Sequence, residues 1–133
     1  MTLAPNTTLR GSIAHNRSAD TLAALRHAVC VYRRAIAGDW HGQCPAFHTA
    51  VANDAAWCLA RVTGEPCDVE PSSHRKFDPK LALCEVYREL AIVCLSRRGA
   101  RRWSSLRARQ AAAELLGIPY AAYVKAASAR RCA

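Results

Sequence analysis

The fold class is decided first by residues 22–36, LAALRHAVCVYRRAI. Large apolar side chains recur there at intervals of three and four; they are Leu22, Leu25, Val29, Tyr32 and Ile36. This spacing places them on one side of an α-helix, whereas a half-buried strand would alternate apolar and polar residues. The arginines of the stretch fall outside that apolar face. We therefore predict an amphipathic helix over residues 18–37 that ends at Gly38.

Four further helices are predicted from the same spacing and from the residues at their ends. They cover residues 45–62, a segment from Asp78-Pro79 towards Gly99, residues 104 or 105 to 116, and residues 119–130. A proline in the first turn and a glycine after the last are typical of helix ends. No alternating pattern longer than four residues indicates a strand. The sequence predicts an all-α, compact bundle of about five helices: a single domain over residues 18–133, preceded by a flexible arm over residues 1–17.

The N-terminal residues are polar, so we expect no secretory signal and a cytoplasmic location, where thiols stay reduced. The chain has seven cysteines. Cys30, Cys84 and Cys94 lie within apolar helical patterns, and we expect them to be buried as small hydrophobic residues. The apolar content of 51% excludes a disordered chain, and no stretch is long enough for a membrane span.

The positive charge is concentrated at one end of the chain. Residues 1–96 contain ten basic and nine acidic residues, for a net charge of +1. Residues 97–133 contain nine basic residues and one acidic residue, Glu114, for a net charge of +8. Arginines that are clustered so densely repel one another, and a polyanion relieves that repulsion. We therefore predict that the arginine-rich C-terminal helical hairpin, residues 97–133, is the contact surface.

Nucleic acid is the partner that this composition favours, DNA more than RNA, because guanidinium groups match phosphate oxygens in bidentate geometry. The candidate binding residues are Arg97, Arg98, Arg101, Arg102, Trp103, Arg107, Arg109, Tyr120 and Lys125. Trp103 would either stack on a base or pack against the domain. Two other interpretations of the cluster remain: a dock for an acidic protein surface, and a solvated face without a partner.

The most specific stretch is residues 108–128, ARQAAAELLGIPYAAYVKAAS. Ala113, Gly117, and Tyr123 or Val124 occupy the positions of the small, turn and anchoring residues of a helix-turn-helix. The segment LGIPYAAYVKAA resembles the end of small CopG/Arc-type ribbon-helix-helix antitoxins and repressors and, less closely, bacterial helix-turn-helix regulators. The resemblance covers about 20 of the 133 residues. It implies a homodimer on operator DNA.

Two features depart from those families. The groove-entering strand of ribbon-helix-helix proteins would fall on residues 97–103, RRGARRW, which lack strand alternation. The start of the last helix offers few polar side chains for reading bases; Tyr120 and Lys125 could each reach a phosphate. A simple helical hairpin is the alternative interpretation of this stretch.

Metal and catalytic chemistry are less favoured. The potential zinc ligands are His41, Cys44 and His48, with Cys58, Cys67 and His74 downstream, but the H-x2-C-x3-H spacing is not that of a standard zinc finger. Cys67 and His74 form the best nucleophile pair, and neither an orienting carboxylate nor an oxyanion hole lies near them in the sequence. We expect no enzymatic activity and no cofactor, and a zinc-stabilised module remains an alternative.

The sequence thus favours a small basic nucleic-acid-binding regulator or accessory protein that acts by occupancy. The many Ala and Arg residues have GC-rich codons, which suggests a mobile element of a GC-rich bacterium. The alternative is a protein-binding inhibitor or adaptor, for example a phage-encoded blocker of a host defence complex, that docks on an acidic surface. A homodimer is compatible with both hypotheses.

Overall fold

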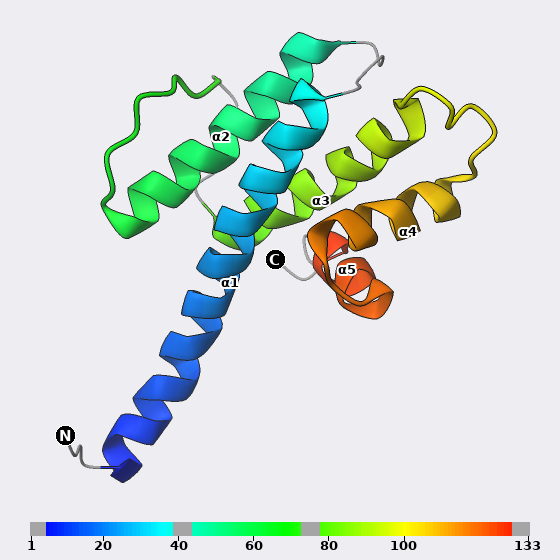
Figure 1. Cartoon of the computed structure of the whole chain (residues 1–133). Helices are drawn as coiled ribbons and strands as arrows, with labels where there is room; N and C mark the ends of the chain where they lie inside the picture. The colour runs from blue at the N-terminus through cyan, green and yellow to red at the C-terminus, as the bar shows by residue number, and fades with distance from the viewer. Residues whose placement is uncertain (1–4, 39–43, 73–77, 129–133) are drawn as a thin grey trace.

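The computed structural model describes residues 5–38, 44–72 and 78–128, with side chains from residue 19 onward. This part of the chain contains five helices and no strand: α1 (Pro5–Ala37), α2 (Pro45–Thr63), α3 (Pro79–Ser96), α4 (Ser105–Leu116) and α5 (Tyr120–Ala127) (Figure 1). The predicted all-α bundle of about five helices is confirmed.

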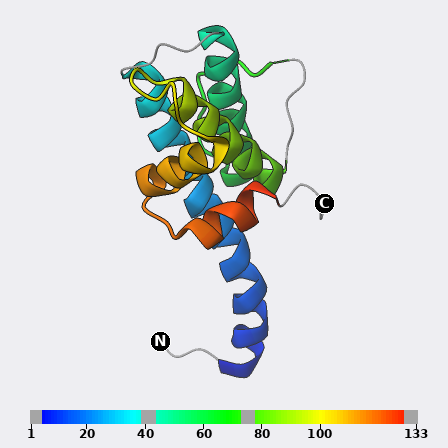
Figure 2. The ribbon, with the colours of Figure 1, turned by 90° about the vertical axis from the view of Figure 1, so that its right-hand side faces the viewer.

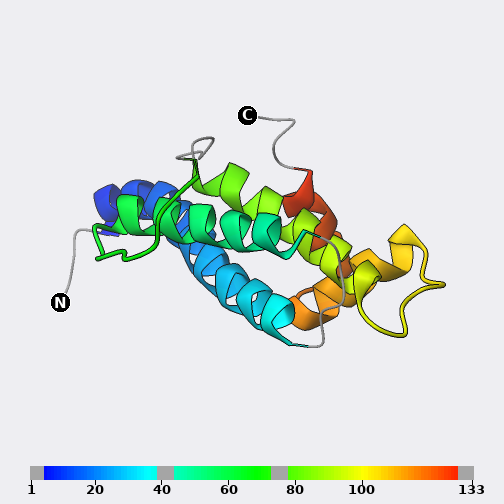
Figure 3. The ribbon, with the colours of Figure 1, turned by 90° about the horizontal axis from the view of Figure 1, so that it is seen from above.

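Helix α3 is the centre of the bundle, since it packs against each of the other four helices (Figures 1 and 3). Half of its 18 residues are buried: Ala82, Leu83, Cys84, Val86, Tyr87, Leu90, Ala91, Val93 and Cys94. A helix that is apolar on most sides is stable only when neighbours cover it. Helix α4 approaches α3 through the small buried residues Ala108, Ala112 and Ala113.

Helix α1 begins earlier than the sequence predicts, at Pro5 instead of near residue 18. Proline suits a first helical turn, where its missing N–H would have no partner. The N-terminal turns of α1 extend beyond the rest of the bundle (Figures 1 and 2). The predicted apolar face on the C-terminal turns is confirmed, because Leu25, Val29 and Tyr32 are buried.

The predicted end signals act in most places as expected. The Asp78 side chain accepts the Lys80 N–H at 2.9 Å at the start of α3. Gly64 and Gly117 end α2 and α4 in the left-handed conformation, with φ of 77° and 71°, which glycine adopts without steric cost. Helix α3 ends at Ser96, so Gly99 lies in the following loop and does not form its cap.

The burial of the cysteines is confirmed at two of three positions. Cys84 and Cys94 are buried, but Cys30 is exposed and its sulfur accepts a hydrogen bond from Arg34 at 3.2 Å. Residues 26, 30 and 34 lie one helical turn apart, on the outward side of α1. The prediction for Cys30 was therefore wrong by one helical position, since its neighbours Val29 and Val31 face the core.

The apolar face of α2 also differs from the prediction. Phe47 and Val62 are exposed, while His48 is buried. The buried face follows residues 48, 52, 55 and 59, a spacing of four, three and four. The apolar spacing of the sequence predicts a stripe of Phe47, Val51, Ala55, Cys58, Leu59 and Val62. Its four middle residues are buried as predicted, and only its two ends are wrong. At the start of the helix the buried face is rotated by one residue, from Phe47 to His48.

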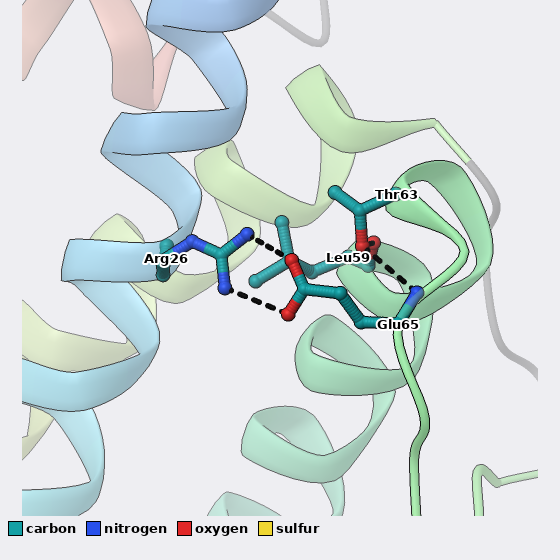
Figure 4. Close-up of polar contacts among 4 residues, drawn as sticks. All are labelled: Arg26, Leu59, Thr63 and Glu65. Carbon is teal, nitrogen blue, oxygen red and sulfur yellow. Dashed lines mark hydrogen bonds and ion pairs between the residues drawn. The ribbon is translucent and has the colours of Figure 1, made fainter.

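Polar contacts fix the segment after α2 against the bundle. Asp54 accepts the backbone N–H and the hydroxyl of Ser72, both at 2.6 Å. Arg26 on α1 forms a bidentate pair with Glu65, at 3.0 and 2.5 Å (Figure 4). Thr63 receives the Glu65 N–H at 3.4 Å. These contacts use acidic side chains of the chain's first 96 residues internally.

Candidate nucleic-acid interface

The loop between α3 and α4 consists of two consecutive turns. The Arg97 carbonyl accepts the Ala100 N–H at 3.0 Å, and the Ala100 carbonyl accepts the Trp103 N–H at 3.1 Å. Ala100 is buried between the two turns, and Gly99 has a φ of 88° that suits glycine. The turns present three exposed arginines at their corners: Arg98, Arg101 and Arg102.

We define the arginine loop as Arg97, Arg98, Arg101, Arg102, Trp103 and Arg107. Within the described residues, no carboxylate lies within ion-pair distance of Arg98, Arg101 or Arg102. Among the described residues, no acidic side chain therefore neutralises these three charges. Arg97 differs, because it caps α3 and is half-buried. The loop is a positive surface where α3 ends and α4 begins, and Arg98, Arg101 and Arg102 have no ion-pair partner in the described part of the chain.

Trp103 anchors this loop. Its ring is half-buried against the core, and the Arg107 guanidinium lies over it, 4.9 Å from the ring centroid. One face of the indole is thus engaged in a cation–π contact and is not open to a base. The Ser104 hydroxyl caps α4 by accepting the Arg107 N–H at 3.2 Å. The positive end of the α4 dipole adds to the field of the arginines.

The remaining three predicted residues lie on α4 and α5, outside the arginine loop. Arg109 Nε donates to the Tyr120 hydroxyl at 3.2 Å. Tyr120 stacks on Tyr123, with 6.1 Å between centroids, and Lys125 is exposed in the last turn of α5. The structure thus divides the nine candidates into the arginine loop, the contacting pair Arg109 and Tyr120, and the exposed Lys125.

The α4–α5 connection is a tight helical hairpin. The Ile118 N–H reaches the Ala113 carbonyl at 3.1 Å, across the left-handed Gly117. Tyr123 is fully buried and donates to the Tyr87 carbonyl at 2.9 Å, while Val124 is exposed. Of the two candidates for the residue that anchors the last helix, Tyr123 and Val124, it is therefore Tyr123 that packs in the core. Residues 97–103, where the family resemblance would require a strand, form two turns.

A buried polar group that the sequence analysis missed joins α1, α2 and α3. The Tyr32 hydroxyl lies 2.5 Å from His48 Nδ1, and Glu89 Oε1 lies 3.9 Å from the same nitrogen. Burial lowers the pKa of His48 and raises the pKa of Tyr32 and of Glu89. The imidazole is therefore neutral, and its Nδ1 accepts a hydrogen bond that the Tyr32 hydroxyl donates. No local pattern marks these three residues, since they come together only in the folded bundle.

The metal and catalytic candidates that the structure describes do not form a group that could hold a metal ion. His41 and His74 lie outside the described residues, and His48 is part of the buried group. Among the residues that the structure describes, no three His, Cys, Asp or Glu side chains are grouped to hold a metal ion. Cys44 and Cys67 are exposed, and Cys58 is buried. None of the helices in the described part of the chain combines the length and apolarity of a membrane span.

No protein-family model matches this chain, and neither a curated protein nor a solved structure does. Functional inference therefore depends on the geometry of the arginine loop and its surroundings.

Proposed function

We propose that the protein binds nucleic acid, preferentially DNA, through the arginine loop, and that it acts by occupying its binding site. The supporting observation is the exposure of Arg98, Arg101 and Arg102 at the corners of two turns, without a carboxylate partner among the described residues. A folded chain gains nothing internally from such a cluster, and phosphates would neutralise it.

The expected contacts are with the phosphate backbone. Guanidinium groups bind phosphate oxygens in bidentate geometry, and each contact releases condensed counterions. Tyr120 and Tyr123, near the start of α5, are occupied in contacts within the protein. Few side chains therefore remain for reading base edges, and we expect little sequence specificity from a single copy.

A salt titration tests the proposal. Fluorescence anisotropy with labelled duplex DNA, single-stranded DNA and RNA of equal length should show binding at roughly 50 mM salt that weakens steeply as salt increases. The triple variant Arg98→Gln/Arg101→Gln/Arg102→Gln should bind more weakly. Its slope of log affinity against log salt should be smaller by about 2–3 on duplex DNA, because about 0.9 is lost for each phosphate contact.

The matched control removes three positive charges elsewhere, in Arg33→Gln/Arg34→Gln/Lys80→Gln. These side chains are exposed on α1 and at the start of α3. Both variants lose three positive charges, but the control keeps the arginine loop intact. The slope of the control should therefore stay close to that of the wild type. Equal slopes for the two variants, or no binding of any nucleic acid at low salt, would overturn the proposal and favour an acidic protein surface as the partner of the loop.

A further inference from the structure

A groove of about 520 Å³ lies between α3, α4 and α5, separate from the arginine loop. Three large apolar side chains in its lining are exposed: Ile92 (46%), Leu95 (37%) and Val124 (39%). They account for three of the seven large hydrophobic residues that are exposed in the described part of the chain. An apolar cluster in a concave surface is typical of a site that receives another molecule.

The exposed charged residues that line the groove are positive. Arg88 on α3 and Arg109 on α4 contribute to the lining. Both are exposed. The one carboxylate in the lining, Glu89, is only 19% exposed and lies 3.9 Å from His48. A partner in the groove therefore meets an apolar floor with positive edges.

The shape favours a helix as the occupant. Arg88, Ile92 and Leu95 follow one side of α3 at a spacing of four and three, which makes a row of about 10 Å, or two helical turns. A second helix can lay an apolar side along such a row, with its own charged residues over the edges. A flat bilayer would not enter a concave groove. A nucleic acid presents charged phosphates, which do not pack against aliphatic side chains.

We propose that this groove binds an amphipathic helix of a partner protein whose apolar residues are flanked by Asp and Glu. A second copy of this chain fits less well, because two of the four exposed apolar residues outside the groove have an arginine as neighbour: Val62 beside Arg61 and Leu106 beside Arg107. Like charges would then meet at the edges of the groove. The proposal concerns a site different from the arginine loop and does not depend on nucleic-acid binding.

A displayed library of helical peptides tests the proposal. Each member has leucines at positions i, i+3, i+4 and i+7, and the flanking positions vary among Glu, Lys, Gln and Ser. Selection on the full-length protein should enrich Glu at the flanks. A synthetic peptide of the enriched sequence should bind Ile92→Gln about tenfold or more weakly than wild type, since central apolar anchors dominate such interfaces.

The matched control is Leu115→Gln, because Leu115 is similarly exposed (41%), lies on α4 and is not part of the groove. It should bind the peptide within about twofold of wild type, as residues outside an interface do. Circular dichroism of both variants separates unfolding from loss of the site. Arg109→Gln should weaken the Glu-flanked peptide and leave a Gln-flanked peptide unchanged.

Four results would overturn the proposal: no enrichment of Glu over Lys, equal losses in Ile92→Gln and Leu115→Gln, a concentration-dependent dimer that Ile92→Gln abolishes, and binding to anionic vesicles that Ile92→Gln abolishes. The last two would assign the groove to a second copy or to a lipid surface. Nucleic-acid binding by Ile92→Gln should remain at the wild-type level, so failure of the groove and failure of the arginine loop are distinguishable.

Discussion

The first three helices and the C-terminal hairpin use charge in opposite ways. Around α1, α2 and α3, acidic side chains find partners inside the molecule: Glu65 pairs with Arg26, and Asp54 holds Ser72. In residues 97–133 the only acidic residue is Glu114, and the exposed arginines of the loop have no carboxylate partner in the described chain.

This difference separates structural charge from charge that is available to a partner. The internal pairs hold the segment after α2 against α1 and α2, whereas the hairpin attaches to α3 mainly through apolar residues. Its attachment consists of small apolar residues on α4 and of Tyr123 on α5. The arginine loop can therefore exchange counterions for phosphate groups without disturbing the packing of α4 and α5 on α3.

The largest effect is expected from removing the attachment of the hairpin. Tyr123 is fully buried, stacks on Tyr87 at 5.5 Å between centroids and donates to the Tyr87 carbonyl. Tyr123→Ala should lower the free energy of unfolding by about 3–5 kcal/mol, as for other large aromatic residues in cores. Urea denaturation followed by circular dichroism measures the change.

Tyr123→Phe keeps the ring and removes only the hydroxyl. Its expected cost is about 1 kcal/mol, the value of one lost hydrogen bond. If the two variants were equally stable, the hydrogen bond and not the ring would fix α5. A negligible loss in both would show that the hairpin is held by other contacts.

Much of this fold was accessible from the sequence, because helix ends and apolar spacing are local signals. Pro45, Pro79, Gly64 and Gly117 mark the ends that the structure has. The errors are also local in kind: Cys30 and Phe47 lie one position away from the buried face. Successive residues of a helix are rotated by about 100° around its axis, so an error of one position assigns a side chain to the wrong side of the helix.

The sites were less accessible, for a different reason. The arginine loop is contiguous in sequence, so its position could be predicted. The groove depends on Arg88 from α3 meeting Arg109 from α4, and on Ile92 and Leu95 lying off the buried face of α3. Only the position of Ile92 and Leu95 could have been predicted from the sequence, because both are apolar and lie outside the apolar stripe of the helix.

An intermediate effect is expected from pH. Burial holds the folded pKa of His48 below its ordinary value of 6.5, so the unfolded chain takes up the proton first. The stability from neutral His48 is fully present above about pH 6.5 and is lost as pH falls through the lower folded pKa. Thermal melts between about pH 7.5 and 5 should show this fall.

Glu89 acts in the opposite direction and must be separated. Its folded pKa is raised above the ordinary 4.5 by burial and by Glu85, so its contribution is complete below about pH 4.5 and is lost as pH rises through the folded value. Glu89→Gln should therefore steepen the loss of stability on acidification. Tyr32→Phe/His48→Leu should flatten it, since both partners of the hydrogen bond are replaced by apolar groups.

The smallest effect on stability is expected from the exposed arginines of the loop. Arg98→Gln/Arg101→Gln/Arg102→Gln should leave the melting temperature unchanged at about 0.5 M salt and equal or higher at low salt, because mutual repulsion is screened beyond a few ångströms at high salt. Arg26→Gln should lower it slightly, since Glu65 loses its partner. A clear loss in the triple variant would mean that the loop arginines are bound within the molecule, and the hairpin would then resemble the first three helices in its use of charge.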